Sequence, residues 1–213
     1  MSKEQLPGPN WFVIRLVRLV AWILAKIYFR YHVEGGEKFP AEGPYIAVSN
    51  HVTTMDAIFL GLPLKGHVAY LVKKEALEHP LKGPFFKAIG GIPVDRGTLD
   101  INTAKTALKC LRHGMALGIL PEGTRTRNGQ IGEFKPGFVK LAILAHAPIV
   151  PAAIIGSFGI LPTPYWFPRP AKVTLRVGDV IDLHEYYGKK TTEEEIQRIS
   201  KTIREEIIRL YNG

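Results

Sequence analysis

The segment INTAKTALKCLRHGMALGILPEGTR, residues 101–125, decides the fold class. Its first half predicts a helix that begins near Asp100 or Asn102 and ends at Gly114. The apolar run Met115 to Leu120 follows directly and predicts a strand, after which the chain turns small and charged. A helix joined through one glycine to a buried strand is typical of α/β proteins.

The same alternation of apolar runs and helical patterns continues on both sides of this segment. The expected strands are Tyr45–Val48, His67–Val72, Ile149–Ile155 and Lys172–Val177, and the expected helices are Met55–Leu62, Pro136–Leu144 and one after Thr192. Thr192 and Glu195 form a capping box at the start of the last helix. We therefore predict an α/β fold with a mixed, mostly buried sheet flanked by helices.

Residues 11–31 predict an amphipathic helix of a different kind. At about 100° per residue, cations share one arc and apolar side chains the opposite side. The cations are Arg15, Arg18, Lys26 and Arg30, and the apolar residues are Leu16, Val20, Ile23, Leu24 and Ile27. Cations are costly at a bilayer centre, whereas in the interface they meet lipid phosphates. We expect a membrane-interface helix; the alternative is a helix packed on the domain with its cations solvated.

Gly35 and Gly36 mark the one boundary that the pattern suggests. We expect a membrane-interface helical segment at residues 1–35 and a globular domain at 36–213. The N-terminus lacks a basic start and a cleavage signal, so no removed signal peptide is expected.

The composition limits the partners and the cofactors. The 213 residues are 46% hydrophobic and 22% charged, with a formal net charge of +9, which argues against a multi-span membrane protein and favours anionic partners. Aromatic residues do not interleave with the cations, so nucleic acid is not expected. Cys110 is the single cysteine, which excludes an intramolecular disulfide and fits a reducing cytosolic face. The histidines lack metal-ligand spacing, and no metal or other cofactor is expected.

Asn50-His51-Val52-Thr53-Thr54-Met55-Asp56 places a histidine after a strand and an aspartate five residues later. Either threonine is available to cap the following helix. With His51 in the turn and Asp56 in the first helical turn, the carboxylate can hold one ring nitrogen. A histidine, whose ordinary pKa is about 6.5, can then take a proton from a hydroxyl as a general base. A packed histidine beside a helix-start aspartate is the alternative.

The stretch Pro121-Glu122-Gly123-Thr124-Arg125 follows a strand, where ligands of open α/β sheets bind. Glycine lets the backbone approach an anion, threonine donates a hydroxyl, and arginine matches phosphate oxygens with two bonds. Glu122 orients the arginine or the turn, or contacts an acceptor hydroxyl. Arg96 can share the anion, and Lys73, Lys74 and Lys135 are further candidates; an exposed charged hairpin is the alternative.

These blocks together resemble the glycerolipid acyltransferase family, best known from the lysophosphatidic acid acyltransferases. Asn50-His51 with Asp56 is similar to the family's His-x4-Asp block, and Pro121 to Arg125 to its Pro-Glu-Gly-Thr-Arg block. Ile92 to Arg96 and Val150-Pro151 resemble the second and fourth blocks. Thr126 stands where serine is common, and the residues between His51 and Asp56 lack the usual serine and aromatics, which bears on the acceptor's identity.

The resemblance implies an acyltransferase domain that acylates 1-acylglycerol 3-phosphate from acyl-CoA or an acyl carrier protein thioester, giving phosphatidic acid. It also implies a monotopic enzyme at the cytoplasmic face of a membrane. His51 would be the base and Asp56 its partner. The expected substrate-binding residues are Lys73, Arg96, Glu122, Gly123, Thr124 and Arg125. Alternatives are another lysolipid or glycerol 3-phosphate as acceptor, a non-catalytic lipid-binding protein, and a serine hydrolase, for which no Gly-x-Ser-x-Gly motif is present.

Overall fold

The computed structural model describes residues 11–66, 68–80, 83–84, 91–94, 101–126, 128–160 and 167–213. The helices are α1 (Trp11–Tyr28), α2 (Asp56–Gly61), α3 (Lys74–Glu78), α5 (Ile101–Arg112), α6 (Gly137–Ala145) and α7 (Glu193–Asn212), with short 3-10 turns at Gly36–Lys38 and His184–Tyr186. The strands are β1 (His32–Glu34), β2 (Tyr45–Ser49), β3 (Val68–Lys73), β4 (Gly91–Val94), β5 (Ala116–Ile119), β6 (Ile149–Ile155) and β7 (Thr174–Val177).

The strands form one sheet in the order β1-β7-β6-β2-β5-β3-β4. Neighbouring strands from β6 to β4 pair in parallel, β6 and β7 pair antiparallel, and β1 pairs in parallel with β7. The predicted mixed sheet is confirmed. Because β6, β2, β5, β3 and β4 share one direction, the loops that follow them all leave from the same edge.

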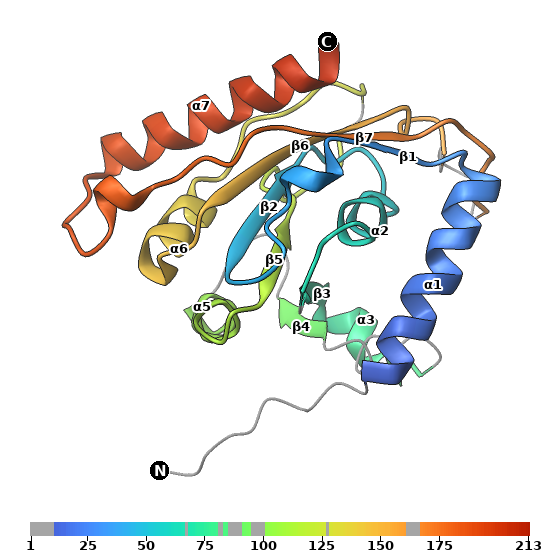
Figure 1. Ribbon diagram of the computed structural model, residues 1–213, viewed down its shortest axis with the longest axis horizontal. Coiled ribbons are helices and arrows are strands. Elements are labelled where there is room, and N and C mark those ends of the chain that lie inside the picture. Colours follow the sequence, from blue (N-terminus) through green and yellow to red (C-terminus); the bar gives the residue numbers. More distant parts are fainter. Residues whose placement is uncertain are drawn as a thin grey trace.

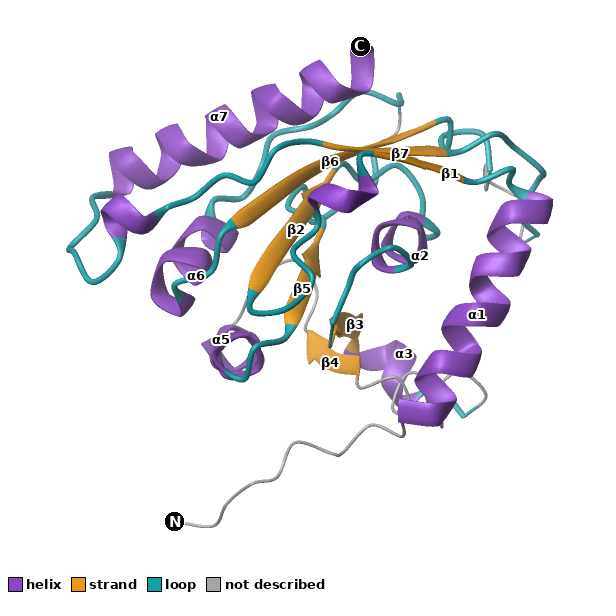
Figure 2. Ribbon diagram, viewed as in Figure 1, coloured by secondary structure: helices purple, strands orange, loops and turns teal. Residues whose placement is uncertain are grey.

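Helices cover both faces of this sheet, as Figure 1 and Figure 2 show. On one side α5, α6 and α7 pack on Ile46, Val48 and Leu117, and on the other α1 and α2 pack on Tyr45 and Ala47. Successive residues of β2 therefore point to opposite cores, as the two-residue period of a strand requires. A strand that is buried on both faces has a continuous apolar sequence, and this pattern predicted β2.

Most expected elements are present, and the differences lie at their ends. The predicted capping box of α7 is confirmed, since Thr192 Oγ1 accepts the N–H of Glu195 while the Glu195 carboxylate accepts the N–H of Thr192. β1, β4 and α3 were not predicted; the three-residue β1 is too short for a pattern of its own and is held by its pairing with β7. The strand predicted from His67 is described from Val68 to Lys73, and His67 itself lies outside the described residues.

The first helix ends at Tyr28, earlier than the Tyr31 predicted, because Arg30 has a left-handed φ of 43° and the chain turns into β1. Ile14 and Ala25 face the domain, while the opposite face exposes apolar side chains. These exposed residues are Phe12, Leu16, Leu19, Val20, Ile23, Leu24 and Ile27. Within the described ranges, none of the helices combines the length and apolarity needed to cross a bilayer.

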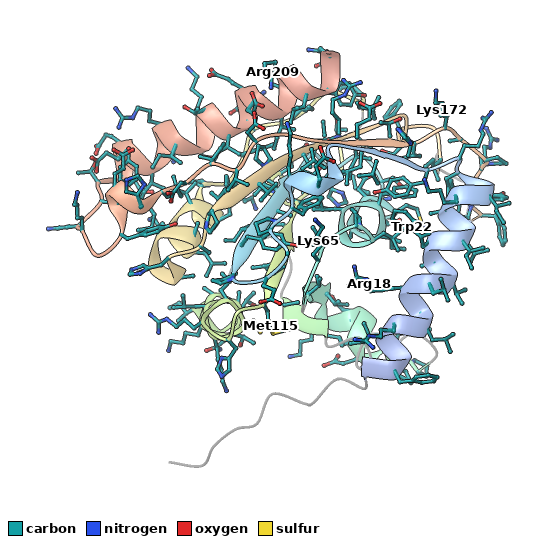
Figure 3. All side chains as sticks on the ribbon, viewed as in Figure 1. Arg18, Trp22, Lys65, Met115, Lys172 and Arg209 are labelled. Atoms are coloured by element: carbon teal, nitrogen blue, oxygen red, sulfur yellow. The ribbon has the colours of Figure 1, made fainter. Side chains whose placement is uncertain are left out.

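Arg18 corrects one expectation about this helix. Its guanidinium donates to the carbonyl oxygens of Leu62, at 2.9 Å, and Leu64, so it does not lie on the outer surface with lipid phosphates. Figure 3 shows Arg18 and Trp22 extending from α1 toward the rest of the molecule. Arg18 therefore ties α1 to the segment after α2. Residues 32–34, within the predicted 1–35 segment, pair in the sheet through β1.

Candidate active site

Two loops meet at the carboxyl edge of the sheet. His51 follows β2 and the Pro121–Arg125 loop follows β5, and these strands are direct neighbours, with Val48 opposite Ile119. The N–H of Thr126 donates to the carbonyl oxygen of His51 at 3.0 Å, which joins the two loops through their backbones. The sheet order thus brings together two motifs that lie far apart in the sequence.

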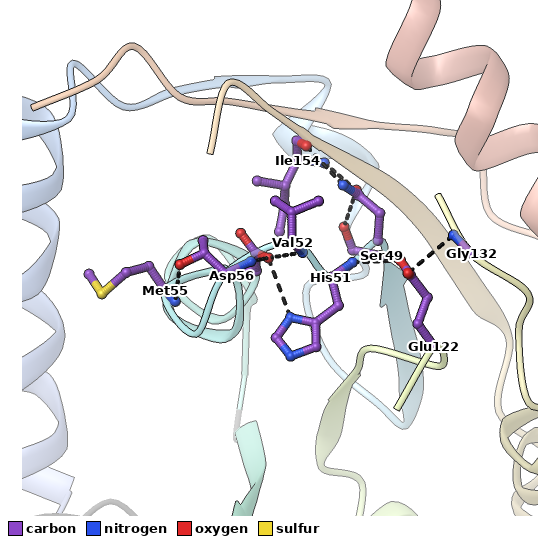
Figure 4. A network of polar contacts seen from close by, with 10 residues as sticks. Ser49, His51, Val52, Met55, Asp56, Glu122, Gly132 and Ile154 are labelled. Carbon is purple, nitrogen blue, oxygen red and sulfur yellow. Dashed lines mark hydrogen bonds and ion pairs between the residues drawn. The ribbon is translucent and has the colours of Figure 1, made fainter. Parts of the chain in front are cut away.

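His51 and Asp56 form a contact across the turn, with 3.3 Å between His51 Nδ1 and Asp56 Oδ2 (Figure 4). Asp56 is fully buried, and the His51 side chain is 18% exposed. The second ring nitrogen of His51 points away from Asp56. A ring that donates Nδ1–H to the carboxylate keeps the Nε2 lone pair free, which is the form that a general base needs.

The turn between these residues is organised by Asp56 and not by a threonine cap. Asp56 Oδ2 accepts the N–H groups of Val52 and Thr53, each at 2.6 Å. Helix α2 has Met55 at its N-cap without a side-chain cap bond, so the expected threonine cap is wrong. Asp56 Oδ1 is buried and has no hydrogen-bond partner in the described part of the chain. Within the described part of the chain, the hydrogen bonds of this carboxylate therefore all converge on Oδ2.

Asn50 holds the start of this turn against the neighbouring strand. Its side-chain Oδ1 accepts the N–H of Ile154 at 2.8 Å, and its Nδ2 donates to the Ile154 carbonyl oxygen at 3.0 Å. A side-chain amide that pairs with one residue's N–H and C=O continues the ladder between β2 and β6 by one step. Asn50 was given no separate role from the sequence, and only the β2–β6 pairing reveals it.

Glu122 bridges the His51 turn and the loop before α6. Its Oε1 accepts the N–H of His51 at 2.8 Å, and its Oε2 accepts the N–H of Gly132 at 3.1 Å. The side chain is 8% exposed. Burial raises the pKa of the Glu122 carboxyl, the two N–H bonds and His51 lower it, and Asp56 raises it. Glu122 thus orients the turn, as one of its expected roles required, while substrate contact stays a prediction.

Gly123 turns the loop so that the next residues face outward. Its φ of 70° is left-handed, so a side chain there would be strained; its Cβ would lie 3.1 Å from Lys135 Nζ, the end of a flexible side chain. Thr124 and Arg125 follow and are exposed. An exposed arginine beside a backbone turn is open to an anion, as the sequence predicted for phosphate.

Two of the predicted substrate-binding residues, Lys73 and Arg96, are described only in part or not at all. Lys73 is the last residue of β3 and pairs with Val94, the last residue of β4, at the same edge of the sheet. Arg96 lies outside the described residues. The structure therefore brings His51, Asp56 and the Glu122–Arg125 loop together, and it leaves the predicted roles of Lys73 and Arg96 as predictions.

Cys110 is not part of this site. It lies in the core formed by α5, α6 and α7 and is 2% exposed. Burial raises the pKa of its thiol, and Lys109 lowers it. Since the thiolate is the reactive form of cysteine, this residue is unsuited to nucleophilic catalysis.

The sequence of this chain is similar to those of several known acyltransferases. The chain is 37% identical over 123 residues to a 1-acyl-sn-glycerol-3-phosphate acyltransferase of Bacillus subtilis (strain 168), a match of 56% of this chain and 60% of that protein. It is 32% identical over 148 residues to the human alpha enzyme of that name, covering 68% of this chain and 52% of the relative. The chain thus spans only about half to three fifths of these relatives.

A structural likeness extends over nearly the whole chain. The crystal structure of a 1-acyl-sn-glycerophosphate (LPA) acyltransferase from Thermotoga maritima superposes with a TM-score of 0.73 at 22% identity, covering 94% of this chain and 81% of that one. This likeness shows the fold. The sequence profile described as Acyltransferase matches residues 30–155, more than half of the chain and all of the loops described above. The chain therefore belongs to the acyltransferase family.

Proposed function

We propose that the protein transfers a fatty acyl group from an acyl thioester to the free hydroxyl of 1-acylglycerol 3-phosphate, giving phosphatidic acid. The observation that carries this proposal is the 3.3 Å contact between His51 Nδ1 and buried Asp56, beside the exposed Arg125. His51 can take a proton from a hydroxyl and Arg125 can bind a phosphate, and this reaction requires both. Relatives that carry the name of this enzyme support the acceptor.

The reaction proceeds by direct transfer. His51 Nε2 takes the proton of the acceptor hydroxyl as its oxygen attacks the thioester carbonyl carbon, and Asp56 stabilises the imidazolium that forms. The tetrahedral intermediate then expels the carrier thiolate, which receives that proton. The products are the new ester and the free thiol. No acyl-enzyme is formed, and no metal or other cofactor takes part.

The protein recognises its acceptor through the acceptor's phosphate group. Arg125 and Thr124 are exposed beyond the left-handed turn at Gly123, where a guanidinium can meet two phosphate oxygens. Lys73 and Arg96, at or after the neighbouring strands β3 and β4, are the further cations for the same anion. Acyl-CoA and acyl carrier protein thioesters present the same carbonyl to the attacking hydroxyl, and either can be the donor.

The proposed location is the surface of a membrane, with the enzyme monotopic and on the cytoplasmic face. The exposed apolar face of α1 supports this, because seven large apolar side chains in solvent are unfavourable until they meet lipid. Arg15 and Lys26 are exposed on the same helix and can meet anionic headgroups. The acceptor is then recruited from the bilayer in which it resides.

The test is to incubate the purified protein with 1-acylglycerol 3-phosphate and a long-chain acyl-CoA or acyl carrier protein thioester, and to measure diacylated product by mass spectrometry. The wild type should form phosphatidic acid, and His51→Ala should lower kcat by about 100- to 10,000-fold because the base is lost. His184→Ala is the matched control. His184 is exposed and lies outside the proposed site, and its Nδ1 is 3.0 Å from Asp182 Oδ2.

Two results would contradict the proposal. Tight binding of the acceptor without product would identify a lipid-binding protein that does not turn over. Full activity of folded His51→Ala would show that another group accepts the proton.

A further inference from the structure

Arg204, on the C-terminal helix α7, contacts the loop that supports the active site. Its Nε donates to the carbonyl oxygen of Gly132 at 2.7 Å, and its Nη2 donates to that of Ile131 at 3.0 Å. The side chain is 22% exposed, and its ion pair with Glu133 is longer, at 3.3 Å, with Glu133 90% exposed. An exposed ion pair contributes little, so the two carbonyl oxygens are the main partners of Arg204.

The carbonyl of Ile131 and the N–H of Gly132 belong to the same peptide group, and this connects Arg204 to the site. That N–H donates to Glu122 Oε2 at 3.1 Å, and Glu122 Oε1 accepts the N–H of His51 at 2.8 Å. A cation on the carbonyl oxygen polarises the peptide, which makes its N–H a better donor to a carboxylate. A continuous chain of hydrogen bonds therefore runs from Arg204 to the backbone of His51, and Figure 4 shows the part from Gly132 to His51.

The close approach of Gly132 to Glu122 makes this chain sensitive to small shifts. A Cβ on Gly132 would lie 3.0 Å from Glu122 Oε2, so a side chain at this position would push the carboxylate away from its hydrogen bonds. Glu122 also faces the charges of His51 and Asp56, and its burial disfavours the anion. The bonds from His51 and Gly132 are what hold the carboxylate charged and in place.

We propose that Arg204 is a positioning residue for the base, which fixes the backbone of His51 through the Ile131–Gly132 peptide and Glu122. The role rests on the proposed acyl transfer, and it adds α7 to the catalytic machinery. Residue 204 lies beyond residues 30–155, which the family profile matches. The family resemblance does not assign it a role.

The test is a double-mutant cycle with Arg204→Gln, Glu122→Gln and the double variant, assayed for acyl transfer at a temperature where circular dichroism shows each to be folded. Arg204→Gln should lower kcat by about 10-fold, because displacement of the base slows proton transfer, while KM for both substrates changes by less than about twofold. In the Glu122→Gln background the same substitution should change kcat by less than about twofold, since residues in one network are not additive.

A second measurement does not depend on activity. The amide proton of Gly132, bonded to a carboxylate, should shift upfield by NMR in Arg204→Gln, and that of His51 should follow it. Were the wild type to make no phosphatidic acid, the proposed function would fail while these shifts still tested the link between Arg204 and His51.

Two variants complete the design. Arg198→Gln is the matched control, because Arg198 lies on the same helix and donates to Tyr186 Oη at 3.3 Å; it should keep wild-type kcat. Arg204→Lys keeps the charge but cannot span two carbonyls, and we expect a kcat between those of wild type and Arg204→Gln. Should Arg204→Gln not fold, Arg204→Lys decides by the same readouts. Additive losses in the cycle, unmoved amide shifts, or an equal loss in Arg198→Gln would overturn the proposal.

Discussion

One oxygen of Asp56 organises the whole catalytic turn. Oδ2 accepts the N–H groups of Val52 and Thr53 at 2.6 Å and lies 3.3 Å from His51 Nδ1. The same carboxylate therefore sets the backbone and faces the ring that it would stabilise. This explains the spacing of five residues between the histidine and the aspartate. The Asp56 carboxylate closes the turn by binding the N–H groups of Val52 and Thr53, and the closed turn places the His51 ring next to the start of α2.

Glu122 carries a prediction about pH. Its pKa is raised above the ordinary value of 4.5, mainly by burial, so the folded state binds this proton more tightly than the unfolded state. The protonated Glu122 carboxyl therefore favours the folded state. This contribution to the free energy of unfolding is fully present below pH 4.5 and is lost as pH rises through the pKa of the folded protein. Glu122→Gln cannot titrate, but its NH2 group faces an N–H donor, which costs about 1–3 kcal/mol.

The wild type should thus be more stable than Glu122→Gln, and the difference should shrink as pH rises from about 4 through the window above 4.5. Urea unfolding of both proteins at several pH values measures this. A difference that grows with pH would show that the hydrogen bonds outweigh burial at this carboxylate.

Arg125 carries a prediction about the acceptor. Arg125→Ala should raise KM for 1-acylglycerol 3-phosphate by about 10-fold or more, because charge-assisted bonds contribute about 1.5–3 kcal/mol, with a smaller effect on kcat. Steady-state kinetics with this acceptor, and with a monoacylglycerol that lacks the phosphate, measure the change. The variant should lose its preference for the phosphorylated acceptor. Arg112→Ala, at the exposed C-terminal end of α5, is the control, and an unchanged preference in Arg125→Ala would exclude phosphate binding.

At the scale of the element, α1 combines two faces with different partners. Ile14 and Ala25 are buried against the domain, while Leu24 is 58% and Ile27 75% exposed. The helix is anchored from the inner side by Arg18, which binds the carbonyl oxygens of Leu62 and Leu64. The outer face therefore remains available to lipid without loosening the fold.

We predict that Leu24→Glu with Ile27→Glu lowers binding to anionic phospholipid vesicles by more than about 10-fold, since each apolar side chain buried in lipid contributes about 1.5–3 kcal/mol. Vesicle sedimentation measures the partition, and thermal unfolding should be almost unchanged because both residues are exposed. Leu144→Glu, 59% exposed on α6, is the matched control. Equal binding by the α1 variant and the wild type would contradict the role of this face.

Helix α7 shows how a terminal element can serve both the core and the site. Its apolar face, including Ile199, Ile203 and Ile207, packs in the core with α5 and α6. Arg204 follows Ile203 directly and points to the loop at Gly132. The packing of the apolar face thus determines where the guanidinium lies.

At the scale of the molecule, the sheet order explains why a compact site arises from separate motifs. β2 and β5 are neighbours although β3 and β4 lie between them in the sequence. This order places the His51 turn beside the Glu122 loop, with the ends of β3 and β4 next along the same edge. Helices pack on both faces of the sheet (Figure 1), and the His51 turn and the Glu122 loop leave from its carboxyl edge.

The sequence by itself was enough to predict the α/β class, most of the buried strands and the last helix. Its apolar periods are local and are imposed by burial on one or both faces. It also indicated His51, Asp56 and the Pro121–Arg125 loop, because their residue types suit proton transfer and anion binding.

Tertiary structure alone decided the rest. The three-residue β1 exists through its pairing with β7, the Asn50 amide pairs with Ile154, and Arg18 turns inward to two carbonyl oxygens. Arg204 reaches the loop at Gly132 from a helix whose sequence shows only an amphipathic pattern. These contacts join residues far apart in the chain, and no local period encodes which distant backbone groups a side chain will meet once the sheet has formed.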